Sequence, residues 1–353
     1  MFVLHIIDAQ TPAEALHNLA QVIGPGEQVV SLGPVDVPAG VSIQVRCLRR
    51  PMGSGILAGM ANAALAAEAA AVHAWSLPAA KAGELIARRG NRPMLLSLPH
   101  FPLSRDFRQL RRMVESGMTS IAVFTDACRR RVLAEGIPDS AIHVVPPAAA
   151  ATPRSAIARE QARQALGLSD RQHLMVAPAD VTHRSGHKYA CWVLGILRQM
   201  RDDVRLLVPS DGPARANVEY FASQIGHGDE VFFTAGRLTI QEALAAADLA
   251  LLLPEGDCCM WSLAAAMAAG LAIVAWETED IAELAGGAGA LSLARAGDVR
   301  SATAEVLRLL EDQAASTSLG ARAAELAARQ FSPAAVRQRL GEIHSAGCRT
   351  ASA

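Results

Sequence analysis

The chain has 353 residues, of which 51% are hydrophobic and 4% aromatic, and its 33 basic and 34 acidic residues leave a formal net charge of -1. This length predicts two domains. The balanced charge argues against nucleic acid as a partner, since proteins that bind it usually carry a basic patch. The six cysteines include no C-x-x-C pair, so we expect reduced thiols and a cytoplasmic protein.

The first part of the chain alternates short apolar runs with helix-forming segments. Strands are predicted at residues 2–7, 28–32, 42–48, 70–75, 93–98, 120–124 and 142–145. Helices are predicted at residues 13–23, 56–71, 79–89, 105–116 and 126–135. Such alternation is typical of a doubly wound α/β sheet. The sequence AAAATPRS at 148–155 lacks a regular pattern and is predicted to be a linker.

The alternation starts again after this linker. Strands are predicted at residues 174–178, 204–209, 231–234, 249–253, 271–276 and 288–293. Helices are predicted at residues 158–166, 189–200, 214–225, 239–246, 262–269, 298–310, 315–330 and 334–345. We therefore expect an N-terminal domain at 1–150, joined by a C-terminal helix at about 334–353, and a second domain at 151–333. Two such sheets should face each other across a cleft.

The segment from 249 to 276 is the most informative part of the chain. A buried strand stops at Pro254, a turn follows to Asp257, and an Ala-rich helix begins near Ser262. In a βαβ unit, ligands bind beyond the carboxyl ends of the strands, and a helix start favours a phosphate. Residues 258–276 are uncharged and long enough to span a bilayer. Acidic flanks and Gly270 argue against that alternative, so no transmembrane segment is expected, although peripheral membrane contact is compatible with the sequence.

Several motifs carry a family resemblance. The turn Ser210-Asp211-Gly212-Pro213 resembles the Gly-x-Gly-Pro turn of retaining GT-B glycosyltransferases of the group 1, or family 4, type. The segments AMAAGLAIVAW and Glu283 follow in the same order as in that family, and Ala71-Val72-His73-Ala74 is similar to its Val-His-Ala-His strand end.

This resemblance implies a GT-B fold, in which two Rossmann-like doubly wound domains face a cleft. It implies a nucleotide-sugar donor held mainly by the second domain. The acceptor, a glycan, lipid or small molecule, would be held by the first domain. It also implies transfer with retention of configuration and no metal or other cofactor.

The acidic donor motif of the family is altered in this chain. The family has two glutamates separated by seven residues, and these positions are Asp257 and Ala265 here. Asp257 keeps a carboxylate for the sugar hydroxyls, whereas Ala265 cannot hold the ribose. Glu255 lies two residues out of register. The resemblance, with the predicted helix start, assigns Met260, Trp261 and Ser262 to the donor site as well.

The basic motif is altered too. The family places an arginine and a lysine after the first strand of the second domain, and these positions are Asp180 and Ser185 here. Arg184 and Lys188 are close in sequence and are our candidates for the diphosphate, because a departing diphosphate requires positive charge. Gly212, in the matching turn, is a further donor-site candidate.

His100 follows a predicted strand at the place where the family has a histidine facing the sugar. The ordinary pKa of histidine suits proton transfer near neutral pH. We therefore assign His100 and Asp257 as catalytic residues of a hexosyltransferase-like enzyme. Two alternatives stay open: a degenerate GT-B module that binds without turnover, and a GT-B nucleotide-sugar epimerase.

Overall fold

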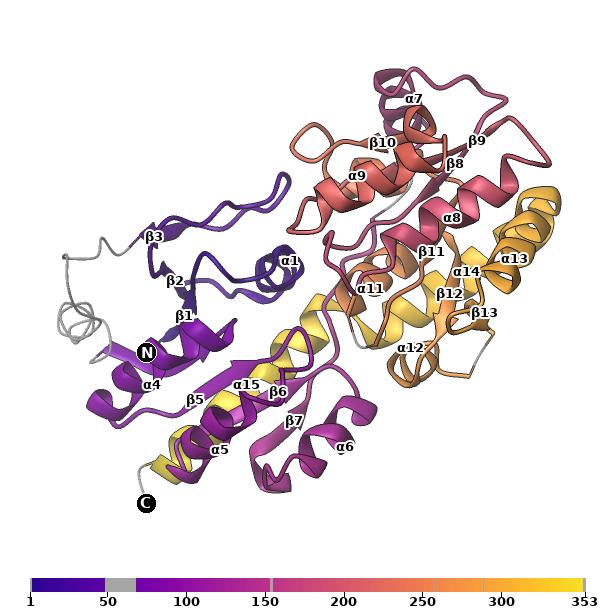
Figure 1. Ribbon diagram of the computed structural model, residues 1–353. Helices are drawn as coiled ribbons and strands as arrows, with labels where there is room; N and C mark the ends of the chain where they lie inside the picture. The colour runs from indigo at the N-terminus through magenta and orange to yellow at the C-terminus, as the bar shows by residue number, and fades with distance from the viewer. Residues whose placement is uncertain (1, 48–67, 153–154, 257, 288, 352–353) are drawn as a thin grey trace. The chain divides into compact units, whose positions relative to one another are not determined.

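The computed structural model describes residues 2–47, 68–152, 155–256, 258–287 and 289–351 (Figure 1). The predicted helix at 56–71 therefore lies largely outside the described residues, and the candidate Asp257 lies wholly outside them. The chain forms two compact units, which are described separately. Unit 1 comprises residues 1–37, 41–148 and 333–353, and unit 2 comprises residues 38–40 and 149–332.

Unit 1 contains a seven-stranded parallel sheet in the order β3-β2-β1-β4-β5-β6-β7. Its strands are β1 (Phe2–Ile7), β2 (Gln28–Ser31), β3 (Val45–Cys47), β4 (Ala69–Ala74), β5 (Met94–Ser97), β6 (Thr119–Val123) and β7 (Ile142–Val144). Its helices are α1 (Ala13–Val22), α4 (Leu77–Gly90), α5 (Phe107–Glu115), α6 (Asp126–Ala134) and α15 (Pro333–Ala351).

The two faces of this sheet are covered by different helices. Apolar residues of α4, α5 and α6 form one core with the strands, and apolar residues of α1 and α15 form the other. The last helix, α15, contacts α1, β4 and β5, so the chain returns to unit 1 after completing unit 2 (Figure 1). Val336, Leu340 and Ile343 are the buried apolar residues of α15 in this second core. Their spacing of three and four residues places them on one helix face.

Unit 2 contains a six-stranded parallel sheet in the order β10-β9-β8-β11-β12-β13. Its strands are β8 (His173–Val176), β9 (Val204–Val208), β10 (Val231–Phe233), β11 (Leu249–Leu252), β12 (Ala272–Glu277) and β13 (Ser292–Arg295). Its helices are α7 (Ala156–Ala165), α8 (His187–Leu197), α9 (Arg215–Gln224), α10 (Ile240–Ala246), α11 (Met260–Ala268), α12 (Glu279–Leu284), α13 (Val299–Glu311) and α14 (Gln313–Gln330).

Several elements of unit 2 differ from the sequence prediction. Helix α12 was not predicted, and it begins at the N-cap Thr278, whose side chain accepts a hydrogen bond from the Ile281 N–H. Strand β13 begins at Ser292, later than predicted, because the preceding glycines Gly286, Gly287 and Gly289 all have positive φ. Helix α11 begins at Met260, two residues before the predicted start.

The two parallel α/β sheets confirm the predicted fold class. The six cysteines form no disulfide. Within the described residues, no helix is both long and apolar enough to cross a membrane.

Candidate donor-binding site

The strand order of unit 2 reverses between β8 and β11. The chain proceeds from β8 to β9 and β10 on one side, and from β11 to β12 and β13 on the other. Ligands of open parallel sheets bind beyond the carboxyl ends of the strands at such a switch point. The candidate ligand site is therefore formed by two segments, 177–186 after β8 and 253–259 after β11.

Backbone and side-chain hydrogen bonds join these two segments. The Glu255 N–H donates to the Arg184 carbonyl oxygen at 2.7 Å. In return, Nε of Arg184 donates to the Glu255 carbonyl oxygen at 3.0 Å. The Cys258 thiol also donates to the Arg184 carbonyl at 3.1 Å. Arg184 and Glu255, which the sequence analysis selected from separate motifs, therefore lie side by side.

Gly186 permits the close approach of the two segments. Its φ is +82°, and a Cβ atom at this position would lie 1.9 Å from the carbonyl oxygen of Leu253. Any other residue would clash with the end of β11 and would also adopt an unfavourable backbone conformation. Gly186 is the N-cap of α8, so the same residue sets where that helix begins.

Ser185 has a structural role at the position where the family has a lysine. Its Oγ accepts a hydrogen bond from the Thr182 N–H at 2.9 Å and lies 2.8 Å from Nδ1 of His187. Burial lowers the pKa of His187 to about 4, so this ring is neutral near pH 7. The positive charge of the segment comes instead from Arg184 and Lys188, which are both exposed.

Tyr189 is a member of this site that the sequence analysis missed. Its hydroxyl donates a hydrogen bond to Oε1 of Glu255, and this bond, with partial burial, raises the pKa of Tyr189. Its ring lies 4.5 Å from the ring of Trp276, measured between centroids. The chain has two tyrosines. The one next to Lys188, at the start of a predicted helix, could therefore have been selected from the sequence as a donor-site candidate.

The side chains at the start of α11 are buried, whereas the sequence analysis assigned them to the donor site. Met260, Trp261 and Ser262 are 1%, 2% and 0% exposed, so they are part of the core and a ligand at this helix start would meet the backbone. The preceding residue, Cys259, has a φ of 74°, which is rare for a residue with a side chain.

Two further candidate residues have different surroundings. Gly212 lies against the backbone of Val181, because a Cβ at Gly212 would be 2.4 Å from the Val181 carbonyl oxygen. It thus joins the turn after β9 to the segment after β8. His100 lies in the loop after β5, in unit 1, and is partly buried.

A cavity of about 170 Å³ lies beside the joined segments. Its lining includes Thr182, Gly186, Lys188, Tyr189 and Glu255. Pockets for small molecules usually measure roughly 300–1,000 Å³, so this cavity could hold only part of a nucleotide sugar. A larger cavity, of about 590 Å³, lies in unit 1 at the amino ends of β1 and β4, which is the edge of the sheet opposite to where such ligands usually bind.

Residues 171–312 match the family described as glycosyl transferases group 1. The matched region lies within unit 2. The match includes the joined segments of 177–186 and 253–259 and every described candidate residue of unit 2. It confirms the group 1 resemblance over these residues.

Solved structures agree with this resemblance. HepE of Anabaena in complex with UDP and glucose has a TM-score of 0.85 at 17% identity, covering 98% of this chain and 100% of that chain. WaaG, a glycosyltransferase involved in lipopolysaccharide biosynthesis, has a TM-score of 0.70 at 15% identity, covering 97% and 99%. These similarities confirm the GT-B fold.

One curated relative matches a shorter segment. The N-acetyl-alpha-D-glucosaminyl L-malate synthase of Bacillus anthracis is 29% identical over 129 residues. The match covers 36% of this chain and 34% of the synthase.

Proposed function

We propose that the protein transfers a hexose from UDP-hexose to an acceptor with retention of configuration and without a metal ion. The observation that carries this proposal is the hydrogen-bonded pair of segments at the switch point of unit 2. Within or beside these segments lie two exposed basic residues, Arg184 and Lys188. Relatives of the same fold support the choice of UDP, since HepE structures contain UDP or UDP-glucose.

The donor diphosphate would lie beyond the carboxyl ends of β8 and β11. Arg184 and Lys188 would neutralise its charge, and positive charge at this place also stabilises the diphosphate as it leaves. The amino end of α11 would add the favourable end of a helix dipole. Glu255, held by Tyr189, and Asp257 are the acidic groups proposed to contact the sugar.

The proposed donor site lacks one family contact. Ala265, on α11, is 9% exposed and offers no carboxylate to the ribose. Losing a hydrogen bond to a charged group costs roughly 1.5–3 kcal/mol, so we expect weak donor binding. Ala265→Glu should strengthen UDP binding if the pocket accepts the longer side chain.

Isothermal titration with UDP, GDP and ADP, followed by assays of UDP release from UDP-hexoses, tests the proposal. We expect UDP to bind best and UDP release to increase when an acceptor is supplied. Proton NMR of the sugar product would show the donor anomer if configuration is retained. Activity that persists in EDTA would agree with a metal-free reaction, and equal binding of all three nucleotides would contradict the choice of UDP.

The degenerate binding module is the second candidate, and Ala265, Asp180 and Ser185 favour it. In that case UDP would bind, but the protein would not release UDP from any UDP-hexose, with or without an acceptor. His100→Ala separates the two readings further, because a catalytic His100 should lower turnover far more than UDP affinity.

A further inference from the structure

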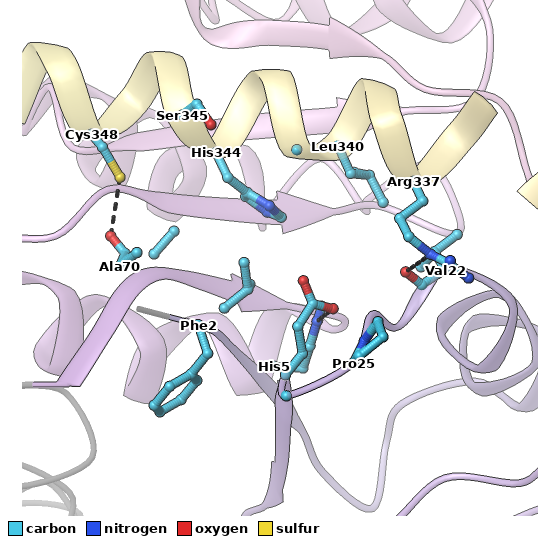
Figure 2. Close-up of a pocket in the computed structure, with 15 residues that line it drawn as sticks. Phe2, His5, Val22, Pro25, Ala70, Arg337, Leu340, His344, Ser345 and Cys348 are labelled. Carbon is cyan, nitrogen blue, oxygen red and sulfur yellow. Dashed lines mark hydrogen bonds and ion pairs between the residues drawn. The ribbon is translucent and has the colours of Figure 1, made fainter. Parts of the chain in front are cut away.

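The 590 Å³ cavity of unit 1 has the features of a ligand site that is separate from the donor site. It lies between α15 and the amino ends of β1 and β4, and both its walls belong to unit 1 (Figure 2). Its volume is within the usual range for small-molecule pockets. Its apolar lining includes Phe2, Val3, Val22 and Leu340.

A buried imidazole points into this cavity from α15. His344 is 9% exposed, and its Nε2 atom has no hydrogen-bond partner among the described residues. Figure 2 shows its ring projecting from the helix toward the strand wall that carries His5. Burial, with a contribution from His5, lowers the pKa of His344 to about 4, so the ring is neutral near pH 7. This nitrogen is itself shielded from solvent, so the ring faces the cavity as an uncharged surface.

The opposite wall holds a fixed carboxylate. Trp75 Nε1 donates to His5 Nδ1 at 3.1 Å, so the other ring nitrogen of His5 carries the proton and donates to Glu27 Oε2 at 3.1 Å. The Gly24 N–H donates to the same oxygen at 2.7 Å. Within the described part of the chain, Oε1 of Glu27 receives no hydrogen bond. Although burial raises the pKa of Glu27, these hydrogen bonds lower it overall, so the group is charged at neutral pH.

The basic residue of the cavity is already used. Nε of Arg337 donates to the Val22 carbonyl at 3.1 Å, and its Nη2 donates to the Gln21 carbonyl at 3.3 Å. These bonds hold the guanidinium at the carboxyl end of α1, where a helix dipole favours positive charge. The charged group left to receive a ligand is therefore the carboxylate of Glu27, beside the neutral imidazole ring of His344.

We propose that this cavity binds a small organic ammonium compound. Its N–H groups donate to Oε1 of Glu27, and its apolar part lies against Phe2, Leu340 and the ring of His344. A neutral alcohol of the same shape lacks the charge that Glu27 recognises, and a carboxylate would be repelled by it.

Three probes of one shape test this proposal on the full-length protein: 4-phenylbutylamine, 4-phenyl-1-butanol and 4-phenylbutyrate. Isothermal titration at pH 7 should give saturable binding of the amine, and the alcohol and the carboxylate should bind at least ten-fold more weakly. Glu27→Gln should weaken amine binding at least ten-fold and remove the preference over the alcohol. Glu342→Gln is the matched control, because Glu342 is on α15, pairs with Arg339 and does not line the cavity.

A second variant blocks the cavity without disturbing the fold. Gly341 lines the cavity on α15, and a Cβ built there meets no atom within 4 Å. Gly341→Leu should therefore fill the cavity, keep or raise the melting temperature because leucine favours helix, and abolish amine binding. The proposal is wrong if the amine does not bind, if the alcohol or the carboxylate binds as well as the amine, or if amine binding survives both Glu27→Gln and Gly341→Leu.

Discussion

The two units have parallel sheets of the same kind, but their switch points are built differently. In unit 1 the carboxylate of Asp8 closes the turn after β1, where its Oδ1 accepts hydrogen bonds from Gln10 N–H, Thr11 Oγ1 and Ser76 Oγ. Asp8 is 7% exposed. In unit 2 the corresponding segments present Arg184 and Lys188 to solvent.

This difference supports the proposal that a donor diphosphate binds to unit 2. At the unit 1 switch point, a buried carboxylate that already accepts three hydrogen bonds repels an anion. The exposed arginine and lysine of unit 2 attract one. A shared fold therefore does not give the two units the same site, and the side chains at the strand ends decide which ligand each unit can accept.

The largest expected effect is that of Gly186→Ala. The added Cβ would overlap the Leu253 carbonyl, so the two segments must separate. We expect a loss of roughly 3–5 kcal/mol of stability, seen as a fall in melting temperature, together with the loss of UDP binding.

Gly226→Ala is the matched control for that variant. Gly226 has a similar φ of +79°, but a Cβ there meets no atom within 4 Å. It should cost only about 1 kcal/mol. Equal destabilisation by both variants would show that the close approach to Leu253 has no special importance.

Asp8→Ala tests the other switch point. It leaves the buried hydroxyls of Thr11 and Ser76 without their acceptor, which should cost roughly 3 kcal/mol of stability. UDP affinity should stay unchanged, because the proposed donor site belongs to unit 2. Urea unfolding and UDP titration of the same sample check both statements, and a large loss of UDP affinity in a folded variant would argue against the separation.

Acid should destabilise both units through buried neutral histidines. Burial lowers the pKa values of His17 in unit 1 and His187 in unit 2 to about 4. Their ordinary value is about 6.5, so the unfolded chain binds more protons between pH 6.5 and 4. Stability is therefore full above pH 6.5 and falls as the pH decreases through this window.

His17→Leu measures the contribution of one such group. Between pH 7 and pH 5, the unfolding free energy of this variant should fall by about 2 kcal/mol less than that of the parent protein. Urea unfolding at both pH values gives this difference. A variant that loses as much stability as the parent over this range would show that His17 does not titrate as described.

The smallest effects are expected at the exposed cations. Arg184→Ala and Lys188→Ala should each weaken UDP binding about ten-fold, which corresponds to roughly 1.4 kcal/mol, and should lower turnover further. Lys81→Ala, on α4 of unit 1, is the control and should leave UDP binding unchanged. If all three variants bind UDP equally well, the assignment of the diphosphate to this segment is wrong.

The sequence predicted the strands and helices of both units well, because short apolar runs bounded by Gly and Pro alternate with helix-forming segments. It placed Arg184, Lys188 and Glu255 at one site through the family resemblance. It could not show that Arg184 and Glu255 exchange hydrogen bonds, since they are 71 residues apart. The start of α11 was misplaced because its first turn is as apolar as a buried strand.

Other features depend on packing that no local pattern contains. Ser185 was counted only as a missing lysine, whereas its hydroxyl closes a turn with Thr182 and His187. The cavity of unit 1 needs His5, Glu27 and His344 together, and these residues come from distant parts of the chain. Neither feature has a spacing that could be recognised in the sequence.

The location of the donor site is tested most directly by hydrogen–deuterium exchange, measured by mass spectrometry with and without saturating UDP-glucose. We predict slower exchange in peptides covering 182–188 and 254–262, and unchanged exchange in peptides covering 8–12 of unit 1. Confirmed binding of UDP-glucose without protection of 182–188 and 254–262 would contradict it.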